Sequence, residues 1–245
     1  FDYTDIHAAP YNVIAEEILK IVNTLPKFPD NIKVLLAKLL QPDILVQDVA
    51  NEISRDPSLS TDLLKFVNSA KFSLQRKIGS IKEAINFVGI KGLKNLLYSY
   101  GAMQAIDTRF GTVNQVWDHS YKTARVAALI AEKMKINKKD DESFTAGLLH
   151  DMGKIILMSF DLGKAKQIDE VCQQRGVDLP VMEEIIMGLS HAKIGGEIAK
   201  YWDFPSSLIS AISYHHDPIM AETDKDTVYM SIWQIILPML KTKRN

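Results

Sequence analysis

The sequence predicts an all-α protein, a two-lobed helical bundle, and three observations indicate this fold class. Glycine and proline are scarce, at 12 and 9 of 245 residues. Between them, apolar residues recur at spacings of three and four, which places them in one stripe along a helix. Alternation of apolar and polar residues, the pattern of a half-buried strand, is essentially absent. The 47% hydrophobic content supplies enough apolar side chains for a sizeable core.

The first lobe, residues 1–110, is expected to contain short helices joined by tight connections over residues 24–105. Two start signals support this division. Asp56 followed by Pro57 fits an N-cap with proline at the first helical position. Ser80 and Glu83 have the spacing of a capping box. The apolar stripes of its first helices are Ile14, Ile18, Ile21 and Val22, then Val34, Leu35 and Leu39, then Val46, Val49, Ala50 and Ile53.

The second lobe, residues 111–245, begins after a predicted joint at residues 110–112. One long helix is marked by the stripe Val116, Thr123, Ala127, Ile130 and Met134, and another by Leu148, Leu149, Met152, Ile155 and Ile156. Further helices are expected over residues 164–175, 181–188, 191–202, 206–215 and 227–240. Because no internal repeat is visible, a solenoid is disfavoured.

Composition limits the partners and the compartment. Because 29 Lys and Arg balance 30 Asp and Glu, no basic field favours nucleic acid or an anionic membrane, and neither is expected as a partner. No apolar run reaches the roughly 18 residues that cross a bilayer, and the N-terminus lacks a signal core. The single cysteine, Cys172, excludes an intrachain disulfide and a thiolate zinc cluster. We therefore expect a cytoplasmic chain, and its start at Phe1 suggests an artificial boundary or a longer parent chain.

Five of the six histidines lie in the second lobe, each in or beside a predicted helix: His119, His150, His191, His215 and His216. Asp151 directly follows one of them. Neutral imidazoles and carboxylates bind divalent ions such as iron, manganese, zinc or nickel, and helical bundles build such sites from inward-facing residues on several helices. The neighbours His150 and Asp151 can meet at one ion only if a helix end faces it, and Gly153 permits such an end. If the turn continues, Lys154, four residues after His150, lies on the same helical side, where an ammonium could neutralise a bound phosphate. The sequence therefore predicts a divalent-metal site.

Several motifs carry a family resemblance. They are Leu25 to Pro29 (LPKFP), Ile53 to Leu59 (ISRDPSL), Phe66 to Ala70 (FVNSA), Ser80 to Ile85 (SIKEAI) and Gly147 to Lys154 (GLLHDMGK). The second lobe resembles the HD superfamily of metal-dependent phosphohydrolases. The stretch from about residue 24 to 220 more specifically resembles the HDOD family, the HD-related output domains of bacterial signalling proteins.

The resemblance implies an all-helical fold and, for most HDOD members, a regulatory or protein-interaction role. His119 matches the first HD ligand, His150 and Asp151 match the paired ligands, and Lys154 matches the phosphate-side lysine. Three further histidines match additional ligands of the related HD-GYP cyclic-dinucleotide phosphodiesterases, namely His191, His215 and His216.

Two departures from these enzymes are visible. HD enzymes supply a last aspartate from a late helix, but residues 227–240 contain no acid, and Asp224 and Asp226 just upstream are expected at the surface. HD-GYP enzymes also carry a glycine after the His-His pair, whereas no glycine follows Gly196. The second departure argues against a standard cyclic-dinucleotide phosphodiesterase.

Two hypotheses follow. The first is a signal-transduction module that binds a signalling protein or an attached regulatory domain and keeps the pocket as a metal site or as a site for a nucleotide or phosphate. The second is a metal-dependent phosphohydrolase, a phosphodiesterase or nucleotidase, in which Lys154 is the catalytic residue on the phosphate side. The absent late carboxylate favours the first.

Overall fold

The computed structural model describes residues 8–41, 43–68, 76–111, 113–133 and 142–221, and over these ranges it contains helices and no strand, which confirms the predicted fold class. The helix expected over 227–240, Asp224 and Asp226 lie outside the described residues. The helices are α1 (Ala8–Asn23), α2 (Asp30–Leu39), α3 (Val46–Arg55), α4 (Pro57–Val67), α5 (Ile81–Phe110), α6 (Asn114–Lys133), α7 (Ser143–Leu149), α8 (Met152–Phe160), α9 (Leu162–Arg175), α10 (Leu179–Met187), α11 (His191–Tyr201) and α12 (Ser206–Ser213), followed by a 3-10 turn at Pro218–Met220.

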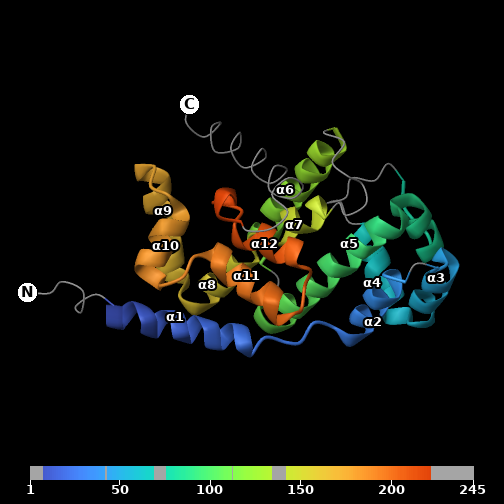
Figure 1. Ribbon diagram of the computed structural model, residues 1–245, viewed down its shortest axis with the longest axis horizontal. Helices are drawn as coiled ribbons and strands as arrows, with labels where there is room; N and C mark the ends of the chain where they lie inside the picture. The colour runs from blue at the N-terminus through green and yellow to red at the C-terminus, as the bar shows by residue number, and fades with distance from the viewer. Residues whose placement is uncertain (1–7, 42, 69–75, 112, 134–141, 222–245) are drawn as a thin grey trace, which may run out of the picture.

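The molecule is elongated, with α2, α3 and α4 gathered at one end and α9 and α10 at the other (Figure 1). The long helix α5 runs from the first group towards the middle, where α6, α7, α8, α11 and α12 pack together. Helix α1 is first in the chain but lies against α8, α10 and α11. The N-terminal helix therefore covers helices of the second half of the chain. The division into lobes at residues 110 and 111 stays a prediction.

The two predicted helix starts have the expected local geometry. The Asp56 carboxylate accepts a hydrogen bond from the Leu59 amide at 3.0 Å. The Ser80 hydroxyl accepts one from the Glu83 amide at 3.1 Å, and the Glu83 carboxylate reaches back to the Gly79 amide at 2.8 Å. Asp56 and Ser80 thus each satisfy an amide that a helix start leaves without an intrahelical acceptor. The second half of the predicted capping box differs, because Glu83 bonds the amide of Gly79 and not that of Ser80.

The expectation of short helices over residues 24–105 is wrong for α5. This helix is interrupted at Gly89, whose φ of 72° and ψ of 177° are not helical, and then continues to Phe110. The positive φ suits glycine, which lacks a Cβ. Beyond Gly89 the helix buries residues such as Leu97 and Ala102 and serves as the central support of the N-terminal group.

Asn68 closes the connection between α4 and α5. Its side chain accepts a hydrogen bond from the Ile78 amide and donates one to the Ile78 carbonyl, both at 2.8 Å. A side-chain amide carries one acceptor and one donor group, so it forms here the same two hydrogen bonds that a partner backbone would form. The two ends of this connection are thereby fixed against each other.

An aromatic cluster joins the segment before α2 to the end of α11. Trp202 donates its indole N–H to the Pro26 carbonyl at 3.1 Å, and the Tyr201 hydroxyl donates to the Leu25 carbonyl at 3.2 Å. Both halves of the chain consequently share one core. The rings that pack together are Phe28, Tyr98, Trp202 and Phe204, with centroids 5.1–6.3 Å apart.

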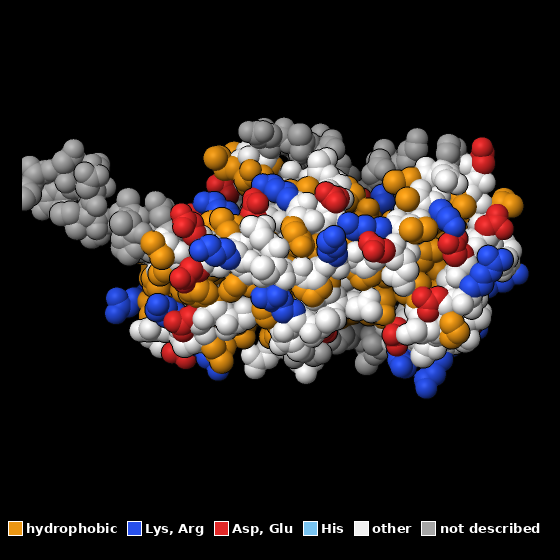
Figure 2. Space-filling view, turned by 90° about the horizontal axis from the view of Figure 1, so that it is seen from below, with side chains coloured by type: hydrophobic (Ala, Val, Ile, Leu, Met, Phe, Trp, Pro, Cys, Tyr) orange, Lys and Arg blue, Asp and Glu red, His pale blue; other side chains and the backbone are white. Residues whose placement is uncertain are grey.

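The surface carries both signs of charge, as the composition predicts. Figure 2 shows Lys and Arg interspersed with Asp and Glu over the face that it presents, so this face has no broad basic patch. Among the described residues, no helix is both long enough and apolar enough to span a bilayer.

Candidate metal centre

The His150-Asp151 pair forms a break between two helices. The apolar stripe over residues 148–156 predicts helix, with an end near Gly153 left open, and the structure has an interruption: α7 ends at Leu149 and α8 begins at Met152. Asp151 leaves the helical region, with φ −96° and ψ 6°. Within a continuous helix neighbouring side chains diverge by about 100°, whereas this turn lets His150 Nε2 lie 3.3 Å from Asp151 Oδ2. The break is therefore what makes the two side chains converge.

Glycines at three helix crossings bring the histidine-bearing helices together. A Cβ at Gly147 of α7 would lie 2.8 Å from the backbone of α6. A Cβ at Gly153 of α8 would lie 2.0 Å from the carbonyl oxygen of His191 in α11. A Cβ at Gly196 of α11 would lie 2.0 Å from the Ser213 hydroxyl in α12. At Gly147 and Gly153 the neighbouring atoms are backbone, so any larger residue would separate these helices and the side chains that they carry.

The first cluster surrounds one oxygen of Asp151. Asp151 Oδ2 lies 2.9 Å from Lys154 Nζ, 3.3 Å from His150 Nε2 and 3.6 Å from His119 Nε2. His150 and Asp151 are buried, whereas the His119 side chain is 47% exposed and the Lys154 side chain 30% exposed. The cluster therefore has a buried floor and an edge that solvent reaches.

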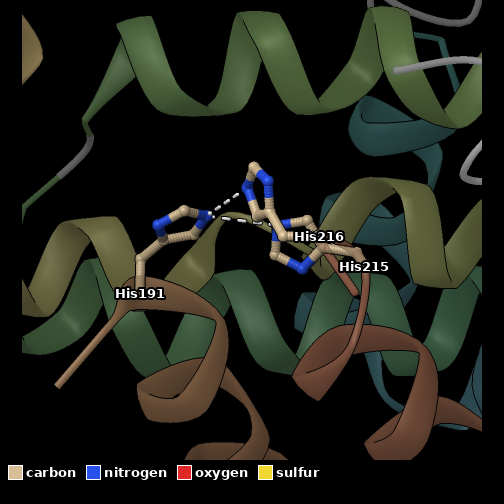
Figure 3. Close-up of side chains that lie close together, drawn as sticks. All are labelled: His191, His215 and His216. Carbon is tan, nitrogen blue, oxygen red and sulfur yellow. Dashed lines mark hydrogen bonds between the residues drawn. The ribbon is translucent and has the colours of Figure 1, made fainter. Parts of the chain in front are cut away.

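The second cluster surrounds the other oxygen of Asp151. His191 Nε2 lies 3.1 Å from His215 Nε2 and 3.1 Å from His216 Nε2. Figure 3 shows the His191 ring of α11 pointing towards both rings that follow α12. Asp151 Oδ1 is 3.3 Å from His191 Nε2 and 3.9 Å from His215 Nε2. The aspartate thus lies between the clusters, and the six predicted ligands and Lys154 form one polar centre.

The hydrogen bonds of three rings determine which nitrogen faces the centre. The Nδ1 atoms of His150 and His215 lie 2.8 Å from the carbonyl oxygens of Gly147 and Ile212. His191 Nδ1 lies 2.6 Å from a carboxylate oxygen of Glu183. Since these oxygens only accept, each Nδ1 carries the proton, and in the neutral ring Nε2 presents a lone pair.

Hydrogen-bond acceptor atoms therefore lie opposite one another in this centre. His191 Nε2 and His215 Nε2 direct lone pairs towards each other across 3.1 Å. Asp151 Oδ1 is buried and accepts no hydrogen bond from the described residues. Converging lone pairs without a proton between them are unfavourable unless a cation lies among them. The donor set of imidazoles and a carboxylate therefore fits a divalent metal ion.

Electrostatics keep these groups in the form that binds metal. Burial and the neighbouring His216 lower the pKa of His215 well below its usual 6.5. Burial and His191 lower the pKa of His216 to about 3. Burial alone would raise the pKa of Asp151, but its neighbours, among them the Lys154 ammonium at 2.9 Å, outweigh burial and hold that pKa well below its usual value. At neutral pH both rings are neutral and the aspartate is ionised.

The charge of Lys154 is retained for the same reason. Burial disfavours its ammonium, but the Asp151 carboxylate more than compensates and raises the pKa of Lys154. The ion pair leaves the ammonium next to the exposed edge of the first cluster. An anion entering beside His119 would meet a positive charge there.

Sequence reasoning missed Glu183 of α10, the residue behind His191. The available signal was its position: Leu179, Glu183 and Met187 lie four residues apart and share the inward face of α10, where an acid is unusual. Nothing in the sequence alone links this acid to His191, because the contact depends on how α10 returns towards α11.

A family model and two known proteins match this chain. The model of the HDOD domain matches residues 25–218. An uncharacterized protein of Treponema pallidum (strain Nichols) is 31% identical over 204 residues, which is 83% of this chain and 40% of that protein. Ribonuclease Y of Pseudothermotoga lettingae is 25% identical over 199 residues, 74% of this chain and 33% of that protein. The chain thus spans two fifths or less of these relatives.

Two solved structures share the fold over nearly the whole chain. An HDOD domain protein of unknown function from Geobacter sulfurreducens is 28% identical, with a TM-score of 0.73 over 95% of this chain and 79% of that one. A candidate phosphohydrolase from Shewanella amazonensis SB2B is 26% identical, with a TM-score of 0.70 over 93% of this chain and 83% of that one.

Proposed function

Since the chain belongs to the HDOD family, we propose that it is a regulatory module of signal transduction that acts through partner binding and retains a divalent-metal centre. The observation that carries the metal centre is the set of converging lone pairs of His191 Nε2 and His215 Nε2 beside the unsatisfied Asp151 Oδ1. The ion is iron, manganese, zinc or nickel, the metals that imidazole and carboxylate ligands suit.

The six ligands divide into two sets. His191, His215 and His216 form one set, and His119, His150 and Asp151 form the other. Because the two oxygens of Asp151 face different sets, one aspartate serves both. A bound ion supplies a Lewis acid that attracts a phosphate oxygen. Lys154, at the exposed edge, supplies a second positive charge for the same ligand, a nucleotide or a phosphate.

The partner in this proposal is a signalling protein or an attached regulatory domain. The Treponema relative extends well beyond the matched region, which supports an attached domain as one form of partner. In the chain itself, the lack of an acid in residues 227–240 supports regulation rather than turnover, because HD enzymes use a late carboxylate there.

The second candidate is a metal-dependent phosphohydrolase, either a phosphodiesterase or a nucleotidase. It is favoured by the half-buried Lys154 beside the exposed His119, an arrangement suited to a phosphoryl group. The likeness to a candidate phosphohydrolase and to a ribonuclease also supports it. In this alternative Lys154 stabilises the phosphoryl charge, and a metal ion held by the histidines and Asp151 would supply the activation of water.

Metal content of the full chain, purified without chelator, tests the proposed centre. We expect at least one iron, manganese, zinc or nickel ion per chain and a higher melting temperature with metal than with EDTA. His215→Ala should lose the ion, and His7→Ala, which changes the histidine outside the set, should keep it. Absence of stoichiometric metal, with no stabilisation by any added ion, would reject the metal centre.

A substrate panel separates the two candidates. Phosphomonoesters, nucleotides and cyclic dinucleotides are incubated with the metal-loaded chain and with His150→Ala. Turnover that the substitution abolishes would establish the hydrolase. A metal-loaded chain inactive on every substrate would favour the regulatory module.

A further inference from the structure

Glu183 is a carboxylate buried in an apolar helix face. It is 5% exposed and lies on α10, eight residues before His191. Burying an ionised carboxylate is unfavourable unless hydrogen bonds or opposite charge compensate it. Here one oxygen, Oε2, accepts two hydrogen bonds from a single residue: from the His191 amide at 2.8 Å and from His191 Nδ1 at 2.6 Å.

These two contacts fix both the position and the direction of His191. The amide belongs to the first residue of α11, where a helix leaves its N–H groups unsatisfied and favours negative charge. The ring contact places the proton on Nδ1 and turns Nε2 towards His215, His216 and Asp151. Figure 3 shows the resulting orientation of the ring.

The charges of the second cluster require a further anion. An imidazole binds a metal ion through the lone pair of its neutral ring, so His191, His215 and His216 bring no charge to the ion. Asp151 is already paired with the Lys154 ammonium at 2.9 Å. Without Glu183, a divalent cation in this cluster would therefore meet nearly no net negative charge.

We propose that Glu183 is a positioning residue of the metal centre, which aligns His191, strengthens it as a ligand and supplies the compensating charge. This inference rests on the proposed function. The Nδ1 atoms of His150 and His215 bond to neutral carbonyls, whereas that of His191 bonds to a carboxylate. A carboxylate behind a ligating imidazole raises its basicity, and losing such a partner typically weakens metal binding about 10–100-fold.

Two substitutions and a matched control test the proposal in the full chain. Glu183→Gln keeps the size and an acceptor oxygen but removes the charge, and Glu183→Met removes both. Glu184→Gln removes the same charge from the adjacent residue, whose carboxylate pairs with Lys193 at 3.0 Å and is partly exposed. Zn²⁺ and Mn²⁺ are titrated into each metal-stripped protein against a competing chelator. We expect about tenfold weaker binding for Glu183→Gln, about 100-fold for Glu183→Met, and wild-type affinity for Glu184→Gln.

A second measurement needs no metal. In ¹⁵N spectra of the metal-free protein, His191 should carry its proton on Nδ1, and Glu183→Met should abolish that preference. Wild-type affinity in both Glu183 variants would overturn the proposal. If the wild-type chain binds no metal, the proposed function fails, and a retained Nδ1 proton in Glu183→Met then also overturns the positioning role. Circular dichroism identifies an unfolded Glu183→Met, in which case the near-isosteric Glu183→Gln decides.

Discussion

Replacing Gly153 by alanine tests whether the metal centre depends on the close approach of α8 to α11. The added Cβ would lie 2.0 Å from His191 O and 2.8 Å from Gly195 N, whereas ordinary Cβ contacts lie at 3.4–4 Å. Both neighbours are backbone atoms, so no side-chain rotation relieves the clash. The helices must separate by roughly 1 Å or more, and overpacking of this kind costs about 1–3 kcal/mol of unfolding free energy.

The same separation should weaken metal binding. Asp151 precedes α8, and its Oδ1 lies 3.3 Å from His191 Nε2 across the crossing. A site tolerates misplacement of only about 0.5 Å. We therefore expect at least tenfold weaker Zn²⁺ binding by chelator competition, alongside the stability loss measured by urea unfolding in EDTA.

Gly163→Ala is the matched control. Gly163 is exposed near the start of α9, and its nearest neighbour, Asp161 Oδ1, would lie 3.4 Å from the new Cβ. Alanine in a helix is favoured over glycine by about 0.5–1 kcal/mol, so this variant should be as stable as the wild type or slightly more stable. If Gly153→Ala matched the control in stability and metal affinity, the crossing would not determine the site.

Three further predictions concern the pH dependence of stability, the charge of Asp151 and the hydrogen bonds of Asn68. In the metal-free protein, unfolding free energy should fall by about 2 kcal/mol for each of His215 and His216 between pH 7 and pH 5, measured by urea unfolding. Their depressed pKa values let the unfolded chain take up protons below pH 6.5 that the folded chain does not, so this stability is present above that pH and is lost as the pH falls. Asp151→Asn should release metal from both clusters, measured by elemental analysis, and cost about 1–3 kcal/mol because Lys154 loses its carboxylate. Asn68→Ala should cost about 1–3 kcal/mol in urea unfolding because two hydrogen bonds of 2.8 Å are lost.

Each of these predictions has its own control. A chain with both His215 and His216 replaced by asparagine should show a flatter pH profile, and an unchanged slope would contradict the assignment. Asp169→Asn alters an exposed acid of α9 and should keep the metal. Asn51→Ala removes an exposed asparagine of α3 that bonds Gln47, and its cost should stay below about 0.5 kcal/mol. Equal losses of unfolding free energy for Asn51→Ala and Asn68→Ala would show that the two Asn68 hydrogen bonds do not stabilise the protein.

The sequence alone determined the all-helical class and two of the helix starts, and it named the candidate ligands. The caps at Asp56 and Ser80 formed as expected because each depends on atoms within four residues of chain. The ligand candidates could be chosen because imidazole and carboxylate are the side chains that bind such metals, whatever their surroundings. This chemistry alone names His150 and His191 as candidates, without any distance between them.

Only the tertiary structure decided how these residues meet. The apolar pattern over residues 148–156 allowed either a continuous helix or an end near Gly153, and only the structure shows the break before Met152 and the close approach of α8 to α11. Glu183 and Glu184 are chemically identical neighbours, yet one is buried behind His191 and the other pairs with Lys193 at the surface. A turn of about 100° between adjacent helical residues makes this difference, and which of the two faces inward is set by the packing of distant helices.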